Sequence, residues 1–125
     1  MTTRDSGNNG ENAVCSYLES LSYQIVKKNY TIRGGEIDII AKKDEIIVFV
    51  EVKTRSVNSL TSGFDAITKA KKLRIIKTAQ HYFLNNSVDL QPRFDVAIVE
   101  ADKDEIVSID YIENAFDMSD TNIIF

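Results

Sequence analysis

The fold of this 125-residue chain is decided by residues 34–55, which read GGEIDIIAKKDEIIVFVEVKTR. Two apolar runs flank a polar turn at 42–45, a pattern that predicts a β-hairpin. Apolar residues occupy both alternating sets of positions in each run, which is typical of strands buried on both faces. Asp38, Glu51 and Lys53 interrupt these runs, and a buried charge is unfavourable unless it is paired or bound to a metal.

The three charges are predicted to share one face of the hairpin. Side chains alternate along a strand, so Glu51 and Lys53 point the same way, about 7 Å apart. A tight turn at 44–45 places Asp38 opposite Glu51, and a tight turn at 43–44 places it on the diagonal. In both registers the carboxylates repel unless a cation intervenes, and their oxygens suit Mg²⁺ or Mn²⁺. The alternative interpretation is a buried Asp38–Lys53 ion pair, with Glu51 near solvent.

Glu11 is a further acid on an apolar helix face. The first helix is predicted from Asn8 or Asn9 to about Leu21, with its apolar residues at helical spacing. Glu11 lies in the first turn, where the helix dipole favours a negative charge. From position alone, Glu11 is either a helix-start residue or a member of the acidic group.

A second helix, predicted from Asp65 or Thr68 to Leu84 with Thr68 as a candidate N-cap, carries a cluster of bases. Within nine residues it holds Lys69, Lys71, Lys72, Arg74 and Lys77. A solvated helix face and a phosphate-binding surface are both compatible with this cluster. Within residues 69–77 no acid accompanies the bases to form i,i+4 pairs, which favours phosphate binding.

Length and composition predict a single α/β domain. The hydrophobic fraction of 43% and the charged fraction of 27% are those of an ordinary globular protein. Further strands are predicted at 24–30, 93–99 and 105–112, giving the order α-β-β-β-α-β-β and a mixed sheet. We expect residues 1–6 to be a flexible N-terminus and residues 113–125 to be an acidic tail with room for one helical turn around Ala115 and Phe116.

Cysteine use and charge distribution indicate the compartment and the partner. Cys15 is the only cysteine, so a reducing compartment is expected. We see no targeting or membrane-spanning segment and predict a cytoplasmic protein without a membrane partner. The net charge is −4, but residues 99–125 hold eight acids against Lys103, so residues 1–98 are net positive. A nucleic-acid partner is therefore compatible with the sequence.

Five segments form an ordered pattern that covers most of residues 7–100. They are Gly10–Ala13, Gly35–Ala41, Val48–Arg55, Lys71 and Arg93–Asp95. This pattern resembles the small bacterial YraN-like family of the PD-(D/E)XK nuclease superfamily, related to archaeal Holliday-junction resolvases. The resemblance implies a restriction-endonuclease-like αβββαβ core, with a mixed central sheet flanked by helices.

The resemblance also implies roles for the site residues. Asp38, Glu51 and Glu11 would bind Mg²⁺ or Mn²⁺, and Lys53 would position or activate the attacking water. The implied activity is endonucleolytic hydrolysis of DNA, with branched or structured DNA as the suspected substrate. Because a resolvase-like enzyme needs two active sites, we expect a homodimer. The bases predicted to contact DNA are Arg33, Arg55, Lys69, Lys71, Lys72 and Arg74.

Two other functions stay open from the sequence. A non-catalytic nucleic-acid-binding or adaptor protein that keeps the nuclease fold is favoured by the acidic net charge. A Mg²⁺-dependent nucleotide hydrolase is disfavoured, because the sequence has no glycine-rich loop of the kind that cradles phosphates.

Overall fold

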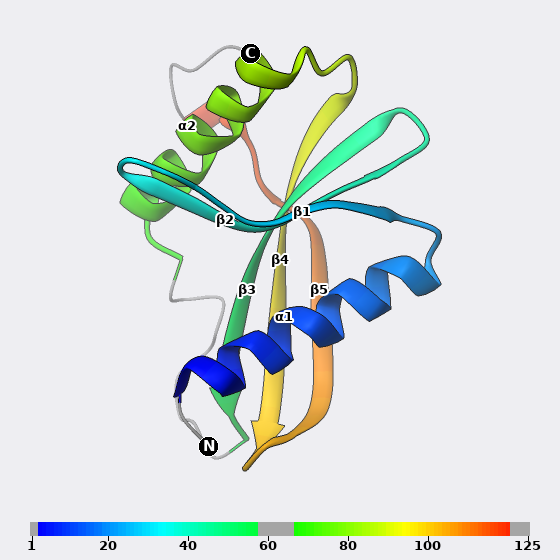
Figure 1. Cartoon of the computed structure of the whole chain (residues 1–125). Coiled ribbons are helices and arrows are strands. Elements are labelled where there is room, and N and C mark those ends of the chain that lie inside the picture. Colours follow the sequence, from blue (N-terminus) through cyan, green and yellow to red (C-terminus); the bar gives the residue numbers. More distant parts are fainter. Residues whose placement is uncertain (1–2, 58–66, 121–125) are drawn as a thin grey trace.

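The computed structural model describes residues 3–57 and 67–120, which form one five-stranded sheet with a helix on each face (Figure 1). The elements in chain order are α1 (Thr3–Ser20), β1 (Gln24–Ile32), β2 (Gly35–Lys43), β3 (Ile46–Ser56), α2 (Lys69–Asn86), β4 (Gln91–Asp102), β5 (Glu105–Phe116) and the 3₁₀ turn η2 (Met118–Asp120).

The sheet is mixed, as predicted. Its strand order is β1-β2-β3-β4-β5, and only the β3–β4 pair is parallel. Parallel neighbours need a crossover connection, and α2 lies in the connection between these two strands. Figure 1 shows α1 crossing in front of β3, β4 and β5, while α2 stands beside the β1–β2 hairpin. The restriction-endonuclease-like αβββαβ core is therefore confirmed.

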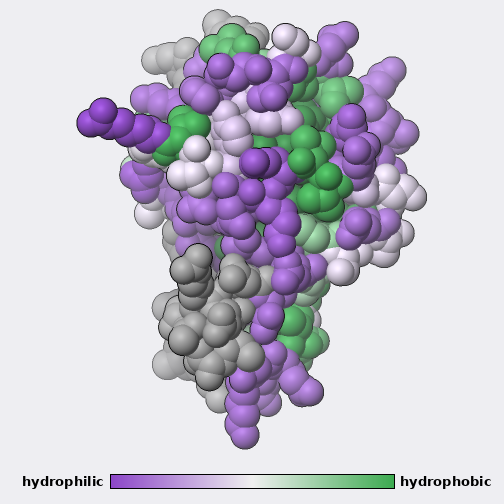
Figure 2. All heavy atoms as spheres, in the orientation of Figure 1, coloured by the Kyte–Doolittle hydropathy of each residue, from purple (hydrophilic) through white to green (hydrophobic). Residues whose placement is uncertain are grey.

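Two hydrophobic cores lie on opposite faces of this sheet. Ile47 and Phe49 of β3 belong to the core that also contains the buried residues of α2. Val48 and Val50 belong to the core that contains the buried residues of α1. The alternation confirms that β3 is buried on both faces. Figure 2 shows hydrophilic side chains over most of the visible surface, with a smaller hydrophobic group toward the right.

The hairpin adopts the register that places Asp38 opposite Glu51. The tight turn is Asp44–Glu45, and its first residue has a φ of 54°. Pairing between β2 and β3 runs from this turn as far as Ile39 and Val50 and then stops. Asp38 and Glu51 are thus the first residues beyond the point where the two strands separate.

The first helix begins earlier than predicted. Helix α1 starts at Thr3, so the predicted start at Asn8 or Asn9 is wrong. The prediction relied on the N-cap preference of asparagine. Gly10 has a tertiary reason to lie in the helix, because a Cβ there would collide with Thr54 Oγ1 of β3. Close contact with the sheet overrides local propensity here.

The last strand is longer than predicted. Strand β5 continues to Phe116, so the helical turn expected around Ala115 and Phe116 is wrong; the 3₁₀ turn follows at Met118–Asp120. The ring of Phe116 is buried and stacks on Phe94, with ring centroids 5.3 Å apart. Burial of this ring extends the strand. The rest of the expected tail, residues 121–125, lies outside the described residues.

The basic helix begins at the predicted N-cap. Helix α2 starts at Lys69, and the side chain of Thr68 accepts a hydrogen bond from the backbone N–H of Lys71 at 3.1 Å. The other predicted start, Asp65, lies outside the described residues. The helix ends at Asn86, slightly beyond the predicted end, and strands β1 and β4 also exceed their predicted bounds.

Candidate active site

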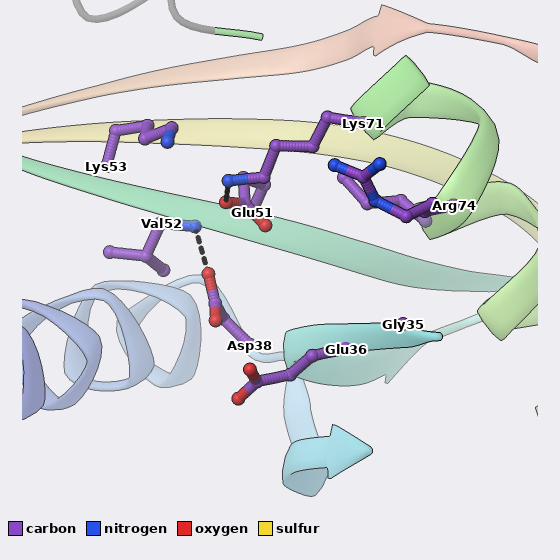
Figure 3. A pocket seen from close by; sticks show the side chains of 9 residues that line it. Gly35, Glu36, Asp38, Glu51, Val52, Lys53, Lys71 and Arg74 are labelled. Atoms are coloured by element: carbon purple, nitrogen blue, oxygen red, sulfur yellow. Dashed lines mark hydrogen bonds and ion pairs between the residues drawn. The ribbon is translucent and has the colours of Figure 1, made fainter. Parts of the chain in front are cut away.

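A pocket of about 380 Å³ opens where β2 and β3 separate, against the first turns of α2 (Figure 3). Most of the residues that line it are charged. The complete lining consists of Gly35, Glu36, Asp38, Glu51, Val52, Lys53, Lys71, Arg74 and Ile75. The pocket therefore gathers the three charged residues of the hairpin, as the alternation of side chains predicted.

Strand separation gives Asp38 its hydrogen-bond partner. Because β2 no longer pairs with β3 at this point, the backbone N–H of Val52 lacks a strand partner on that side. It donates instead to Asp38 Oδ2 at 2.8 Å. This bond fixes one carboxylate oxygen of Asp38 on β3 and keeps the side chain beside Glu51.

A glycine lets β2 approach α2 at the rim of the pocket. A Cβ on Gly35 would collide with Thr78 Oγ1 and lie 3.2 Å from the carbonyl oxygen of Arg74. Thr78 is fully buried, and its hydroxyl donates to that same carbonyl at 2.7 Å. Any larger residue at position 35 would push the start of β2 away from the helix that carries Lys71.

Asp38 is strongly perturbed. Burial, the largest cause, and the nearby charge of Glu51 together raise the pKa of Asp38 to about 8, while the hydrogen bond from Val52 opposes both. Burial and a neighbouring like charge both disfavour a carboxylate anion. A site that holds these two carboxylates in their charged forms therefore calls for a cation.

The second carboxylate of the pocket, Glu51, forms an ion pair with Lys71. Lys71 Nζ lies 2.6 Å from Glu51 Oε1, and the side chain of Glu51 is only 8% exposed (Figure 3). The alternative interpretation, a buried Asp38–Lys53 pair with Glu51 near solvent, is wrong. Asp38 takes the backbone hydrogen bond of Val52, while Glu51 is the buried partner of an ion pair.

Lys53 and Lys71 influence each other. A hydrogen bond with Lys71, followed by burial and the positive charge of Lys71, lowers the pKa of Lys53. Burial alone would lower the pKa of Lys71, but its bonds with Glu51 and Lys53 outweigh burial and raise it. Lys53 is consequently the amine in the pocket that gives up its proton more readily.

Glu11 lies near the pocket without lining it. Burial raises the pKa of Glu11, a hydrogen bond with Asn29 opposes that shift, and the charges of Glu36 and Glu51 add to it. Its Oε1 atom is buried and has no hydrogen-bond partner. The helix face that carries Glu11 reaches the sheet because Gly10 allows close contact with β3.

The predicted DNA-binding bases of α2 divide between two surfaces. Lys71 and Arg74 line the pocket, on the side opposite Glu36 (Figure 3). Lys69 is exposed, and the ammonium of Lys72 lies over the ring of Phe116, 5.8 Å from its centroid. The structure therefore brings only part of this basic cluster to the site.

The two remaining predicted bases lie away from the pocket lining. Arg33 is exposed in the turn between β1 and β2, beside Gly34, which has a φ of 92°. Arg55 forms an ion pair with Glu100, with 2.7 Å between nitrogen and oxygen, and these residues are register partners on β3 and β4. Glu100 neutralises part of the positive charge expected from Arg55.

A second charged network lies on the other face of the sheet. Asp95 is fully buried and accepts hydrogen bonds from Arg93, from the hydroxyl of Tyr111 and from the backbone of Asn114. Arg93 also donates to the hydroxyl of Tyr23 at 2.8 Å. These bonds make the Arg93–Asp95 segment an internal clamp that joins β4 to β5 and to Tyr23, the residue just before β1.

Residues 10–99 match the uncharacterised protein family UPF0102. The chain belongs to the UPF0102 family. A UPF0102 protein of Nitrosomonas europaea is 36% identical over 92% of this chain and 96% of its own length. A UPF0102 protein of a Sulfurihydrogenibium species is 40% identical over 94% of this chain and 99% of its own length. A UPF0102 protein of Flavobacterium psychrophilum is 38% identical over 90% of this chain and 93% of its own length. Membership confirms the resemblance to the YraN-like family.

The matched region of this UPF0102 chain contains Glu11 and every residue that lines the pocket. In the described ranges, 3–57 and 67–120, no helix is long and apolar enough to cross a membrane. The pocket thus lies entirely within the residues that define membership of the family.

The donor set of the UPF0102 pocket fits a small oxygen-preferring cation. No group of three or more His, Cys, Asp or Glu side chains among the described residues has the spacing of a metal cage. Mg²⁺ does not need such a cage, because one or two carboxylates, water and substrate phosphate commonly complete its shell. Asp38 and Glu51 would supply the two carboxylates, and Glu11 has an unpartnered oxygen nearby.

Sequence reasoning missed two features of the pocket. Glu36 lines it and shares the alternation of Asp38, so spacing along β2 contained that signal. The ion pair between Lys71 and Glu51 had no such signal, because these residues belong to different elements. Only the packing of α2 against the sheet brings them together.

Proposed function

We propose that this protein is a metal-dependent endonuclease that hydrolyses phosphodiester bonds in DNA. One observation carries the proposal: Asp38, Glu51 and Lys53 converge in one pocket together with Lys71 of α2. Two carboxylates can hold a divalent ion and two amines can bind anionic oxygens, and both features assist phosphodiester hydrolysis.

Asp38 and Glu51 would hold Mg²⁺ or Mn²⁺, with Glu11 as a third carboxylate close by. The ion, when bound, would polarise the scissile phosphate and make a water molecule more acidic. Val52 keeps Asp38 oriented through its backbone hydrogen bond, so one oxygen of this carboxylate stays fixed while the other faces the pocket.

Lys53 would act on the attacking water. Its side chain lines the pocket two residues after Glu51, on the same face of β3. The lowered pKa, caused by its bond with Lys71 and by burial, favours release of its proton and so allows Lys53 to accept one from water. Lys71 and Arg74 would hold phosphate oxygens at the side of α2.

Incubation of purified protein with labelled DNA tests the proposal. Branched, single-stranded and duplex substrates are each mixed with Mg²⁺, with Mn²⁺ or with EDTA. We expect metal-dependent cleavage, strongest on a branched or otherwise structured substrate, and its loss in Asp38→Asn and Lys53→Met. Asp110→Asn and Lys42→Met make the same charge changes at exposed positions and serve as matched controls. Cleavage that persists in Asp38→Asn would show that the site is misassigned.

A second candidate function is a non-catalytic nucleic-acid-binding or adaptor protein. The Lys71–Glu51 pair favours it, because a buried carboxylate that already has a lysine partner does not require a metal ion for stability. This function predicts DNA binding that EDTA leaves unchanged, with no cleavage under any metal. The assays with EDTA and Mn²⁺ separate the two functions.

A homodimer is part of the proposal. Strand β5 is an edge of the sheet, and Val107 on it is 58% exposed. An unpaired strand edge can extend its sheet by pairing with a second copy. Sedimentation over a range of protein concentrations tests this: a monomer at the highest concentration would exclude the homodimer.

A further inference from the structure

Lys71 is held at Glu51, one of the two carboxylates that a metal ion would also need. Its backbone N–H caps onto Thr68 Oγ1 in the first turn of α2. Its ammonium reaches Glu51 Oε1 at 2.6 Å, and its side chain is 31% exposed compared with 8% for Glu51. The long lysine stem can therefore turn toward solvent while the backbone stays capped.

An ion at Glu51 and the ammonium of Lys71 cannot share this carboxylate favourably. Magnesium lies about 2.0 to 2.1 Å from its oxygen ligands, so an ion on Oε1 would lie less than about 5 Å from the ammonium. Two cations this close, in a half-buried pocket, repel strongly. Metal binding is thus opposed unless Lys71 moves.

We propose that Lys71 is a built-in counter-ion of Glu51 that a divalent ion displaces, so that this side chain sets the metal affinity and then binds DNA phosphate. The inference rests on the metal site of the proposed function. It deepens that function, because it makes the positive charge at the pocket mouth depend on metal loading.

Displacement couples the metal to DNA. With Lys71 on Glu51, its positive charge is neutralised inside the pocket. A divalent ion adds positive charge and releases the ammonium, so the loaded pocket attracts a phosphodiester more strongly. Coupling of two binding equilibria is reciprocal, so DNA raises the metal affinity by the same factor.

Calorimetry and Mn²⁺ electron paramagnetic resonance, both without DNA, test the displacement. We expect Lys71→Met to bind Mn²⁺ about tenfold more tightly than the wild type, the effect of removing one charge-assisted bond. Lys71→Gln, which keeps a donor for Glu51 without the charge, should behave likewise. Lys77→Met removes a charge from an exposed position of the same helix and should change the affinity less than about twofold. Equal affinities in Lys71→Met, Lys71→Gln and Lys77→Met would overturn the inference.

Failure of the metal site itself gives a different result. If the wild type binds Mn²⁺ and Asp38→Asn does not, the metal site of the proposed function is supported. The Mn²⁺ affinities of the Lys71 variants then decide this inference alone. If neither the wild type nor Lys71→Met binds Mn²⁺, both the proposed function and this inference are wrong. A wild-type crystal soaked in Mn²⁺ provides a check without substitution: Lys71 should have left Glu51, and an ammonium still bonded to an ion-bound Glu51 would contradict displacement.

DNA binding gives a second readout. In EDTA, Lys71 is engaged with Glu51, so Lys71→Met should alter DNA affinity little. In Ca²⁺, an oxygen-preferring ion, the released ammonium contributes, and the substitution should weaken binding severalfold. An equal loss in EDTA and in Ca²⁺ would show that Lys71 binds phosphate independently of the metal and would overturn the coupling.

Discussion

The backbone N–H of Val52 donates to Asp38 Oδ2 at 2.8 Å, just beyond the last paired residues of β2 and β3. A strand that loses its neighbour must satisfy its free donors in another way. Here a carboxylate side chain replaces the missing strand. The same separation that opens the pocket therefore also orients its most perturbed acid.

Asp38 makes stability depend on pH in metal-free protein. Burial and then Glu51 raise its pKa to about 8, whereas an unfolded Asp has a pKa of about 3.9. Between these values only the folded chain retains the proton. The free energy of unfolding should therefore fall as pH rises through this window, by up to about 1.4 kcal/mol per pH unit.

Urea unfolding in EDTA, from about pH 5 to about pH 8, measures this effect. Asp38→Asn keeps an oxygen that can accept from Val52 and cannot ionise, so its stability should fall less over this range. Asp110→Asn, exposed on β5, should follow the wild type. Parallel curves for the wild type and Asp38→Asn would show that the pKa of Asp38 is ordinary.

Gly10→Ala should destabilise the protein. The added Cβ would collide with Thr54 Oγ1, and overpacking of this kind costs about 1 to 3 kcal/mol. The double variant Gly10→Ala/Thr54→Ala removes the colliding oxygen, so it should recover much of the loss. Denaturant unfolding of the four proteins of this cycle gives the coupling energy. Additive effects would mean that α1 and β3 do not meet at these residues.

Tyr111→Phe should destabilise the clamp on the other face of the sheet. The lost hydroxyl donates to the fully buried Asp95, and a hydrogen bond to a charged group contributes about 1.5 to 3 kcal/mol. Tyr17, whose ring lies 5.4 Å from that of Tyr111, is 36% exposed, and Tyr17→Phe should change stability by less than about 0.5 kcal/mol. Similar thermal unfolding of the two variants would contradict the assigned bond.

Lys53→Met should lower kcat for DNA cleavage by about 10²- to 10⁴-fold, the usual contribution of a positioned proton acceptor. KM and Mn²⁺ affinity should change little, because Asp38 and Glu51 remain. Lys42→Met, an exposed position on β2, is the control with the same charge change. A rise in KM at unchanged kcat would reassign Lys53 from catalysis to DNA binding.

Much of the fold followed from local patterns. Apolar residues occupy both alternating sets of positions before and after Asp44, and this pattern predicted a hairpin whose strands are buried on both faces. The prediction succeeded because side-chain alternation along a strand is short-range and regular. Thr68 was recognisable as an N-cap because the preference of threonine for that position is also local. Helix α1 began earlier than predicted, and β5 ended later, because contacts with Thr54 and Phe94, distant in sequence, decide those boundaries.

Side-chain alternation holds in either register, so the order of residues along the hairpin is enough to place Asp38, Glu51 and Lys53 on one face. Tertiary structure alone decided what those charges meet. The packing of α2 against the sheet placed Lys71 on Glu51, and the parallel pairing of β3 with β4 placed Glu100 beside Arg55. Contacts between separate elements depend on how the whole chain buries its apolar surface, and residue spacing does not specify them.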